Sequence, residues 1–152
     1  RRQTKKIKKM TINEIQDQII EEFSVFEDWM DKYNYLIELG RECPIIEEKD
    51  KKDNNLIKGC QSRVWVSAEI IDGKMVIKAD SDAVITKGIV TLLLRVFNNQ
   101  SPKDVYDSEL YFIDQIGLST HLSPTRSNGL LAMVKQIKLY ALAFIVKESE
   151  NK

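Results

Sequence analysis

The chain has few of the residues that build disulfides and metal sites. It is 152 residues long and contains two cysteines, one histidine and three prolines. Two cysteines and one histidine cannot fill a Cys/His zinc site without carboxylates, and no recognisable ligand spacing supplies them, so no metal site is expected. No apolar run approaches the roughly 18 residues that a membrane-spanning helix needs, so we expect a soluble protein without a membrane partner.

The charges sum to zero but are unevenly distributed. Residues 1–9, RRQTKKIKK, hold six Lys and Arg and no acid, which leaves 17 bases against 23 acids in residues 10–152. A net acidic body argues against nucleic acid as the main partner.

The basic run itself allows three interpretations: a nucleic-acid-binding arm, the remnant of a targeting leader, or a stretch upstream of a natural start at Met10. We favour the last. We therefore expect residues 1–9 to be a disordered or non-native extension and residues 10–152 to form a single domain. The run lacks the apolar core of a secretory signal, so we expect a cytoplasmic protein in which a Cys43–Cys60 disulfide would not persist.

Helical signals open the domain. Thr11 and Glu14 form a capping box that begins a helix to about Phe23. Ser24 is expected to cap a second helix that ends at Gly40. The spacing of apolar residues predicts an inner face on this second helix that contains Phe26, Met30, Tyr33 and Ile37.

Strand signals follow a charged loop. The alternating segments at 63–71 and 74–81 are joined by Asp72-Gly73, a typical hairpin turn. LIK at 56–58 is expected to add a short third strand.

Helices complete the chain. Ser81 or Asp82 is expected to cap a helix with Val84 on its buried side, and Ser123 with Pro124 is expected to begin the last helix. The order of elements predicts an α+β fold, in which a small three-stranded antiparallel sheet is covered by helices.

Cys60 occupies an unusual place for a structural cysteine. It follows Gly59 on the connection between the first two expected strands, with Lys58 and Arg63 nearby. Glycine permits a tight turn, and two converging cations would favour the thiolate over the thiol. A free cysteine can equally be a small buried hydrophobe, so spacing alone leaves both interpretations open.

Three motifs together resemble the SufE family, whose members accept sulfur from PLP-dependent cysteine desulfurases. The motifs are GCQSRVW at 59–65, HLSPTRSNGL at 121–130 and a helical YLIELG at 35–40. They occur in the family's order, and the resemblance covers the chain from Met10 to the last helix. It implies a fold like that of the iron–sulfur scaffold IscU.

The resemblance also implies a function. Cys60 would take the terminal sulfur from a desulfurase persulfide and carry it, as a persulfide, to an iron–sulfur cluster assembly scaffold. The protein would stimulate the desulfurase as a carrier rather than act as a stand-alone enzyme, and it would hold no cofactor of its own. In this family the position of Cys43 is typically apolar, so a packing role at the end of a helix is expected for Cys43.

Supporting roles follow for motif residues near Cys60. Gly59 allows the turn, Gln61 is favoured as a hydrogen-bond donor to the persulfide, and Ser62 is favoured as a partner of the backbone. Asn128 and Gly129 are expected to let the last helix pack closely on the Cys60 segment.

The second motif also contains two candidates with ionisable side chains. A structural role is favoured for His121, because sulfur transfer between low-pKa thiols needs no strong general base. Arg126 lies in a first helical turn, where the dipole disfavours a cation. It should therefore be held by an internal carboxylate, a partner's acid or the sulfur anion.

Two other functions compete with sulfur transfer. A Cys/His-dependent hydrolase could use Cys60, His121 and an acid such as Asp114, although no nucleophile signature accompanies them. A scaffold that assembles clusters itself is disfavoured, because it would need several thiol ligands.

Overall fold

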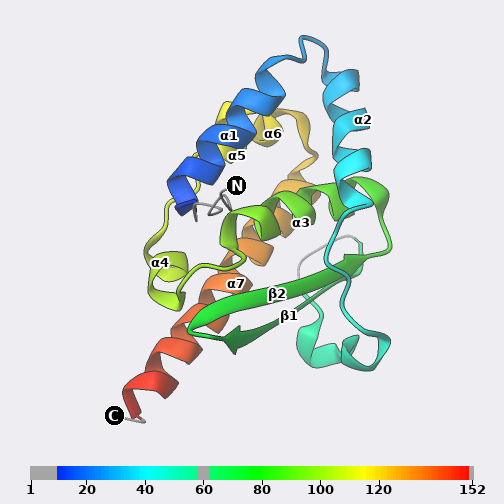
Figure 1. The fold of residues 1–152 in the computed structure, drawn as a ribbon. Coiled ribbons are helices and arrows are strands. Elements are labelled where there is room, and N and C mark those ends of the chain that lie inside the picture. Colours follow the sequence, from blue (N-terminus) through cyan, green and yellow to red (C-terminus); the bar gives the residue numbers. More distant parts are fainter. Residues whose placement is uncertain (1–9, 58–61, 151–152) are drawn as a thin grey trace, which may run out of the picture.

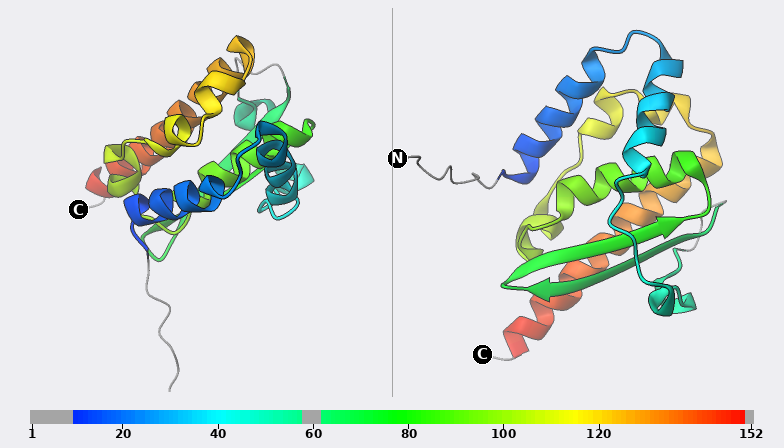
Figure 2. Two further views of the ribbon diagram at one scale, coloured as in Figure 1. Left: turned by 90° about the horizontal axis from the view of Figure 1, so that it is seen from above. Right: turned by 45° about the vertical axis from the view of Figure 1, so that its right-hand side comes forward.

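The computed structural model describes residues 10–57 and 62–150, which form an α+β fold. Helices α1 and α2 stand at one end of the molecule, the strands lie toward the other, and α3 and α7 lie against the strands (Figure 1, Figure 2). The expected extension at 1–9 is outside the described residues. The elements are α1 (Ile12–Ser24), α2 (Trp29–Gly40), the 3-10 turns η1 (Glu48–Asp50) and η2 (Asp53–Asn55), β1 (Val64–Ile71), β2 (Lys74–Ser81), α3 (Val84–Phe97), α4 (Pro102–Asp107), α5 (Phe112–Gln115), α6 (Leu118–His121) and α7 (Pro124–Glu150).

Local signals position α1 as predicted. The Thr11 hydroxyl accepts a hydrogen bond from the Glu14 N–H at 3.1 Å, and the Glu14 carboxylate accepts one from the Thr11 N–H at 2.9 Å. This capping box satisfies N–H groups that the first helical turn leaves without partners. Ile19 and Phe23 are buried, so the spacing that predicts the helix also predicts its inner face.

The start and the inner face of α2 differ from the prediction. Ser24 ends α1, where its hydroxyl donates to the Glu21 carbonyl, and Asp28 caps α2 by accepting from the Met30 N–H at 3.0 Å. Met30 is 60% exposed, whereas Leu36 is fully buried. Because α2 carries apolar residues on more than one face, its crossing with α3 decides which face is covered.

The hairpin turn between β1 and β2 is the predicted one. Asp72 and Gly73 have φ values of 53° and 78°, the left-handed conformation that a two-residue type I′ turn requires. The antiparallel register places Val64 opposite Ser81.

The prediction of a third strand is wrong, because the described residues contain only two strands. Leu56 of the LIK segment pairs with Trp65 in a single isolated bridge. At the next position the Tyr140 hydroxyl of α7 donates to the Val66 carbonyl at 3.0 Å. A tertiary contact with a helix thus takes the place of further strand pairing.

The outer edge of β2 is closed without a neighbouring strand. The Asn98 side chain bonds both backbone groups of Ile77: Oδ1 accepts from the Ile77 N–H at 2.6 Å, and Nδ2 donates to the Ile77 carbonyl at 3.1 Å. An edge that is satisfied in this way is protected from pairing with other chains. Backbone groups of Asn99 and Gln100 bond Met75, and those of Pro44 and Ile46 bond Ala79.

Replacing Asn98 with alanine is expected to lower the free energy of unfolding by about 2 kcal/mol. The change leaves the N–H and carbonyl of Ile77 without partners, and an unsatisfied buried group costs about 1–3 kcal/mol. Ile77 is 1% exposed, so water cannot readily replace the amide. Urea unfolding measures the loss. The control is Asn34→Ala, at an exposed position of α2, which should stay within about 0.5 kcal/mol of wild type. Equal stability of the two variants would show that the amide bridge contributes nothing.

The start of α3 also departs from the prediction. Its N-cap is Ala83, which has no side-chain capping bond. The Ser81 hydroxyl accepts from the Ala83 N–H at 3.2 Å, and the Asp82 carboxylate accepts from the Arg63 N–H. Val84 is 59% exposed instead of buried. The polar side chains that could cap α3 bind other backbone groups, which leaves its first turn open.

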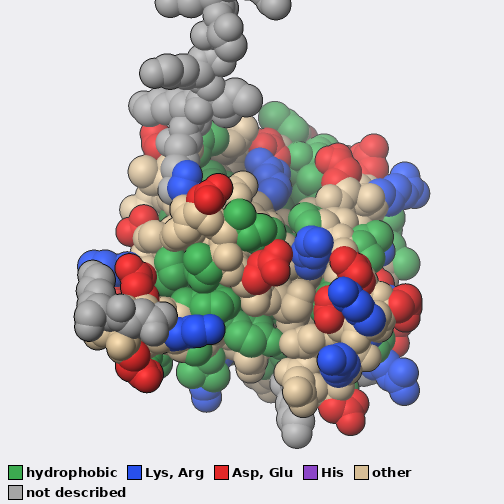
Figure 3. Space-filling view, turned by 60° about the horizontal axis from the view of Figure 1, so that its bottom comes forward, with side chains coloured by type: hydrophobic (Ala, Val, Ile, Leu, Met, Phe, Trp, Pro, Cys, Tyr) green, Lys and Arg blue, Asp and Glu red, His purple; other side chains and the backbone are tan. Residues whose placement is uncertain are grey.

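Hydrophobic side chains also reach the surface. Figure 3 shows a group of them left of the centre of the face seen from below, whereas acids and bases cover much of the right side. On α7, Leu131 is 65% exposed and Leu139 is 47% exposed. By length and composition alone, α7 could cross a membrane, whereas the sequence analysis expected no such segment. Within the most apolar 18-residue window of α7, 28% is buried inside the fold. Since Leu130 and Ile137 lie in the core, α7 is a core helix on one side and exposes apolar residues on the other.

Candidate functional site

The sequence places the candidate nucleophile in the connection that leads into β1. Gly59, Cys60 and Gln61 lie outside the described residues. Ser62, two positions after the cysteine, is described and half-buried. The surroundings of Ser62 therefore define the site.

Both flanks of this connection are hydrogen-bonded to the sheet or to the start of α3. On the upstream side, the Ile57 N–H donates to the Val64 carbonyl at 2.8 Å. On the downstream side, the Arg63 N–H donates to the Asp82 carboxylate at 3.1 Å, and the Asp82 N–H donates to the Arg63 carbonyl at 3.3 Å. These bonds fix where the connection leaves and rejoins the fold.

A small cavity lies beside Ser62. Its volume is about 10 Å³, close to the space that one water molecule needs. It brings together Ser62, Arg126 and Gly129, which are far apart in the sequence. Its lining consists of Ser62, Thr86, Ile89, Thr125, Arg126, Gly129 and Met133.

Two helices begin at this cavity. Thr86 lies in the first turn of α3, and Thr125 and Arg126 lie in the first turn of α7. The first N–H groups of a helix have no partners within it and carry a partial positive charge. Together with the Arg126 guanidinium, they favour an anion such as a thiolate or perthiolate at the cavity.

The start of α7 is set by the predicted capping residues. Pro124 is the first helical residue, and the Ser123 hydroxyl accepts from the Arg126 N–H at 3.3 Å. Arg126 is half-buried, and within residues 10–57 and 62–150 it forms no ion pair. The internal carboxylate that the sequence analysis offered as a partner of Arg126 is thus not found among those residues.

The two residues that follow in the motif have different surroundings. Gly129 is buried and lines the cavity, opposite the segment that contains Ser62. Asn128 is exposed and is not part of the lining. Of these two residues, only Gly129 thus reaches the cavity.

His121 lies outside the cavity, in contact with α2. Its ring stacks on Trp29 with centroids 4.0 Å apart, and its Nδ1 is 2.9 Å from the Gly117 carbonyl. The Tyr33 hydroxyl donates to the His121 carbonyl at 3.2 Å. Figure 1 shows α6, which ends at His121, beside α5 at the end of the molecule away from the strands. These contacts give His121 a structural role that joins α6 to α2.

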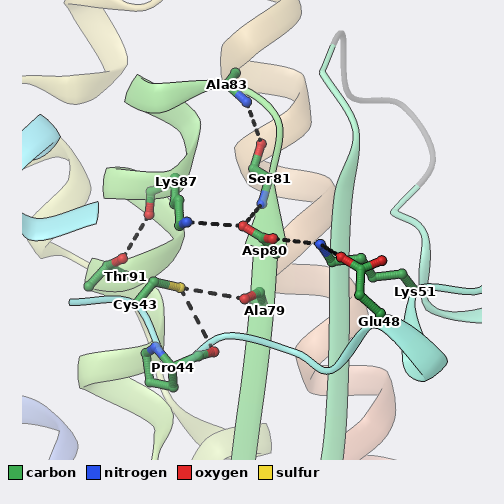
Figure 4. Close-up of polar contacts among 10 residues, drawn as sticks. All are labelled: Cys43, Pro44, Glu48, Lys51, Ala79, Asp80, Ser81, Ala83, Lys87 and Thr91. Atoms are coloured by element: carbon green, nitrogen blue, oxygen red, sulfur yellow. Dashed lines mark hydrogen bonds and ion pairs between the residues drawn. The ribbon is translucent and has the colours of Figure 1, made fainter. Parts of the chain in front are cut away.

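Asp80, near the end of β2, connects the segment around Lys51, which precedes the cysteine motif, to α3 (Figure 4). Its carboxylate pairs with Lys51 at 2.8 Å and with Lys87 at 3.2 Å. Burial raises the pKa of Asp80, but hydrogen bonds from Lys51, the Ser81 N–H and Lys87 outweigh burial, so the pKa lies below its ordinary value. Lys51 Nζ also lies 5.3 Å from the centre of the Trp65 ring. The carboxylate thus stays ionised and holds this segment beside the first turn of α3.

Cys43 is a poor candidate for the nucleophile. It is buried, and its thiol points toward the Ala79 carbonyl at 3.7 Å (Figure 4). Burial raises the pKa of the Cys43 thiol, which therefore stays protonated at neutral pH. Its surroundings agree with the packing role expected from the sequence.

Sequence reasoning missed two polar residues of the cavity, Thr86 and Thr125. Neither stands in a recognisable motif with the cysteine, and only the crossing of α3 and α7 brings them to Ser62. A metal is not indicated: within the described part of the chain, no group of three or more His, Cys, Asp or Glu side chains could hold an ion.

Comparison with known proteins identifies the family. The fold resembles the solution structure of a hypothetical protein from Thermus thermophilus, with a TM-score of 0.73, 20% identity, and coverage of 87% of this chain and 96% of that chain. At this identity the likeness concerns the fold alone. Residues 17–141 match the family model described as SufE: Fe-S metabolism associated domain. Because that match spans most of the chain, including both motifs around the cavity, the protein belongs to the SufE family.

Proposed function

We propose that this protein is a cytoplasmic sulfur carrier that accepts sulfur on Cys60 from a PLP-dependent cysteine desulfurase. It delivers that sulfur to an iron–sulfur cluster assembly scaffold and stimulates the desulfurase by removing its product. Family membership places the chain in Fe–S metabolism. The observation that carries the proposal is the cavity beside Ser62, where two helix N-termini and a guanidinium meet next to the cysteine motif.

The transfer requires no oxidant. The Cys60 thiolate attacks the outer sulfur of the donor's persulfide, a new S–S bond forms, and the donor's own S–S bond breaks. The donor cysteine leaves as a thiolate, and Cys60 holds a perthiolate. An acceptor thiolate then attacks the outer sulfur in the same way and releases the Cys60 thiolate.

The cavity supports this chemistry by stabilising negative charge. Both the attacking thiolate and the perthiolate product are anions, and partial positive charge from α3 and α7 lowers their free energy. Thr86 and Thr125 supply hydroxyl groups at the same place. No side chain needs to transfer a proton in the sulfur-exchange step.

The hydrolase alternative has less support. It requires an imidazole beside the nucleophile, oriented by a third group. His121 instead stacks on Trp29 and has its Nδ1 next to the Gly117 carbonyl. These contacts connect His121 to α2 and α6.

Mass spectrometry tests the proposed function. The protein is incubated with a cysteine desulfurase from the same genome and with cysteine, and is then measured intact and after digestion. We expect the added mass of one sulfur atom on the peptide that contains Cys60, and its removal by a thiol reductant. A chain that gains no sulfur from this desulfurase would contradict the proposal.

Arg126→Ala is expected to slow sulfur loading of Cys60 by about tenfold or more, because it removes a charge-assisted interaction with the sulfur anion. Arg126→Lys retains the charge, so it should slow sulfur loading less than Arg126→Ala does. The pH at which Cys60 becomes reactive toward iodoacetamide should also move upward in the alanine variant. A purely structural arginine would not shift this profile.

The matched control for this arginine is Lys147→Ala, which removes a cation from the far end of the same helix. Circular dichroism and urea unfolding check that every variant is folded. If Arg126→Ala loads sulfur at the wild-type rate and keeps the wild-type pH profile, Arg126 does not stabilise the anion.

A further inference from the structure

A groove of about 880 Å³ runs along α7 beside the candidate site. Ala132, Lys135 and Leu139 line it on the α7 side, and Asp53 and Leu56 line the opposite wall. Asn54, Ile57 and Gln136 complete the lining, so polar and apolar residues contribute equally, with a cation on one wall and an acid on the other.

The far wall of this groove is held in place by α7. The Tyr140 hydroxyl lies 3.3 Å from the Asn55 side-chain oxygen and also donates to the Val66 carbonyl. The Asn55 amide donates to the Asp50 carbonyl at 2.6 Å. Since these bonds fix the segment that forms the wall, the groove exists without a bound partner.

The groove and the cavity beside Ser62 are both lined by α7. Met133 lines the cavity, and its neighbour Ala132 lines the groove. On the opposite wall Ile57 lines the groove and stands three positions before Cys60 in the sequence. A protein that docks in the groove therefore contacts Ile57, the described residue that leads into the cysteine motif.

The charge of α7 and the residues just before it differs from that of the rest of the chain. Residues 115–147 contain no Asp or Glu but four bases, whereas residues 10–152 as a whole have six more acids than bases. Lys135 is exposed and forms no ion pair with any described residue. One helical turn to either side of it, Leu131 and Leu139 are 65% and 47% exposed.

We propose that this groove docks an amphipathic segment of the sulfur donor, with an acid facing Lys135 and apolar residues covering Leu131 and Leu139. An amphipathic helix matches this lining, because its apolar side can cover the leucines while its polar side places an acid at Lys135, the exposed cation without an ion pair among the described residues. The identity of the partner as the desulfurase rests on the proposed function; the chemistry of the occupant rests on the groove.

A lipid surface fits this groove less well. An anionic membrane would meet Asp53 on the opposite wall, and a groove offers a lipid surface less contact than a flat face.

Calorimetric titration without cysteine tests the docking, using the full chain and purified desulfurase from the same genome. Leu139→Asp places a carboxylate in the apolar contact, and Lys135→Glu reverses the charge. Each should weaken binding by about tenfold or more, and Lys135→Arg should stay within about threefold of wild type. The effect of Lys135→Glu should shrink as salt concentration rises.

Two matched controls lie outside the groove. Lys147→Glu reverses a charge further along α7, and Ile71→Asp changes a 49% exposed residue at the hairpin. Both should bind within about twofold of wild type. Wild-type affinity in both groove variants, or equal weakening in the controls, would overturn the docking site.

Two further outcomes would assign the groove to another occupant. A wild-type dimer in sedimentation that Leu139→Asp dissociates would make a second copy the occupant. Flotation with phosphatidylglycerol vesicles that depends on Leu139 would make a membrane the occupant. Either result overturns the proposal.

The proposed function is tested separately by loading wild-type protein with glutathione persulfide, a donor too small to use the groove. Loading on Cys60 without desulfurase binding would leave the carrier chemistry intact and overturn the docking. Binding that depends on the groove, with no sulfur on Cys60 from either donor, would support the docking and refute the carrier role.

Discussion

Cys60→Ser is expected to abolish sulfur acceptance while leaving the protein folded. A serine hydroxyl is not ionised at neutral pH and cannot attack a sulfane sulfur as a thiolate does, nor can it hold a persulfide. Intact mass spectrometry after incubation with desulfurase and cysteine should show one added sulfur on wild type and none on the variant. Circular dichroism and urea unfolding should show near-wild-type stability, because the substitution is nearly isosteric.

The matched control is the other cysteine. Cys43 is buried with its thiol directed at the Ala79 carbonyl, and burial raises its pKa. Cys43→Ala should therefore keep sulfur loading on Cys60 and lose about 1 kcal/mol of stability from the smaller side chain. Sulfur on Cys43 in the Cys60→Ser variant, or full transfer activity in that variant, would refute the assignment of the nucleophile.

Gly88→Ala is expected to lower the free energy of unfolding by about 3 kcal/mol, a large loss for the addition of one methyl group. A Cβ at Gly88 would lie 2.1 Å from the carbonyl oxygen of Leu36 and 2.7 Å from its carbonyl carbon. Leu36 is fully buried within α2, so its backbone cannot move aside as a flexible side chain could. The better helix propensity of alanine returns only about 1 kcal/mol, less than the cost of overpacking.

The consequence of Gly88→Ala should extend to the site. Thr86 and Ile89, which stand on either side of Gly88 in α3, line the cavity beside Ser62. Separation of α2 from α3 should therefore also slow sulfur loading.

Urea unfolding measures the effect of Gly88→Ala, with Gly40→Ala as a graded comparison. A Cβ at Gly40 would meet the backbone nitrogen of Gly88 at 3.1 Å, a milder contact, so a smaller loss is expected. Val84→Ala, at a 59% exposed position of α3, should change stability by less than about 1 kcal/mol. A Gly88→Ala protein as stable as wild type would mean that α2 and α3 do not cross so closely.

Features governed by neighbouring residues were predictable from the sequence. The capping box at Thr11 and Glu14, the turn at Asp72-Gly73 and the start of α7 at Pro124 all occur as expected. Each depends on backbone groups within four residues of one another. Local hydrogen bonding and φ preferences therefore specify them without reference to the rest of the fold.

Features that depend on distant partners were not predictable. Asp28 rather than Ser24 caps α2, and the open turn at Ala83 replaces a capped start of α3. The expected third strand is a single bridge at Leu56, and Tyr140 of α7 bonds the neighbouring carbonyl instead. At the start of α3 and at the expected strand, contacts with Arg63 and Tyr140 from elsewhere in the chain occupy the polar groups, whereas Asp28 caps α2 by a local bond to the Met30 N–H.

The candidate site divides in the same way. The motifs identified Ser62, Arg126 and Gly129 as candidates and led us to expect the last helix near the Cys60 segment, but they did not indicate the cavity or its two threonines. His121 stood in the same motif as Arg126, yet its ring packs on Trp29. A motif names residues, whereas the directions of their side chains follow from the helix faces that packing selects.

Short-range backbone chemistry and residue type were enough to specify the α+β class, the helix starts at Thr11 and Ser123, the hairpin and the cysteine motif. Long-range packing was needed to bring the first turns of α3 and α7 together beside Ser62 and to leave Arg126 without an acid among the described residues. The reason is physical: the first turns of α3 and α7 lie about forty residues apart in the chain, and only the packing of α3 on α7 brings them to the same cavity.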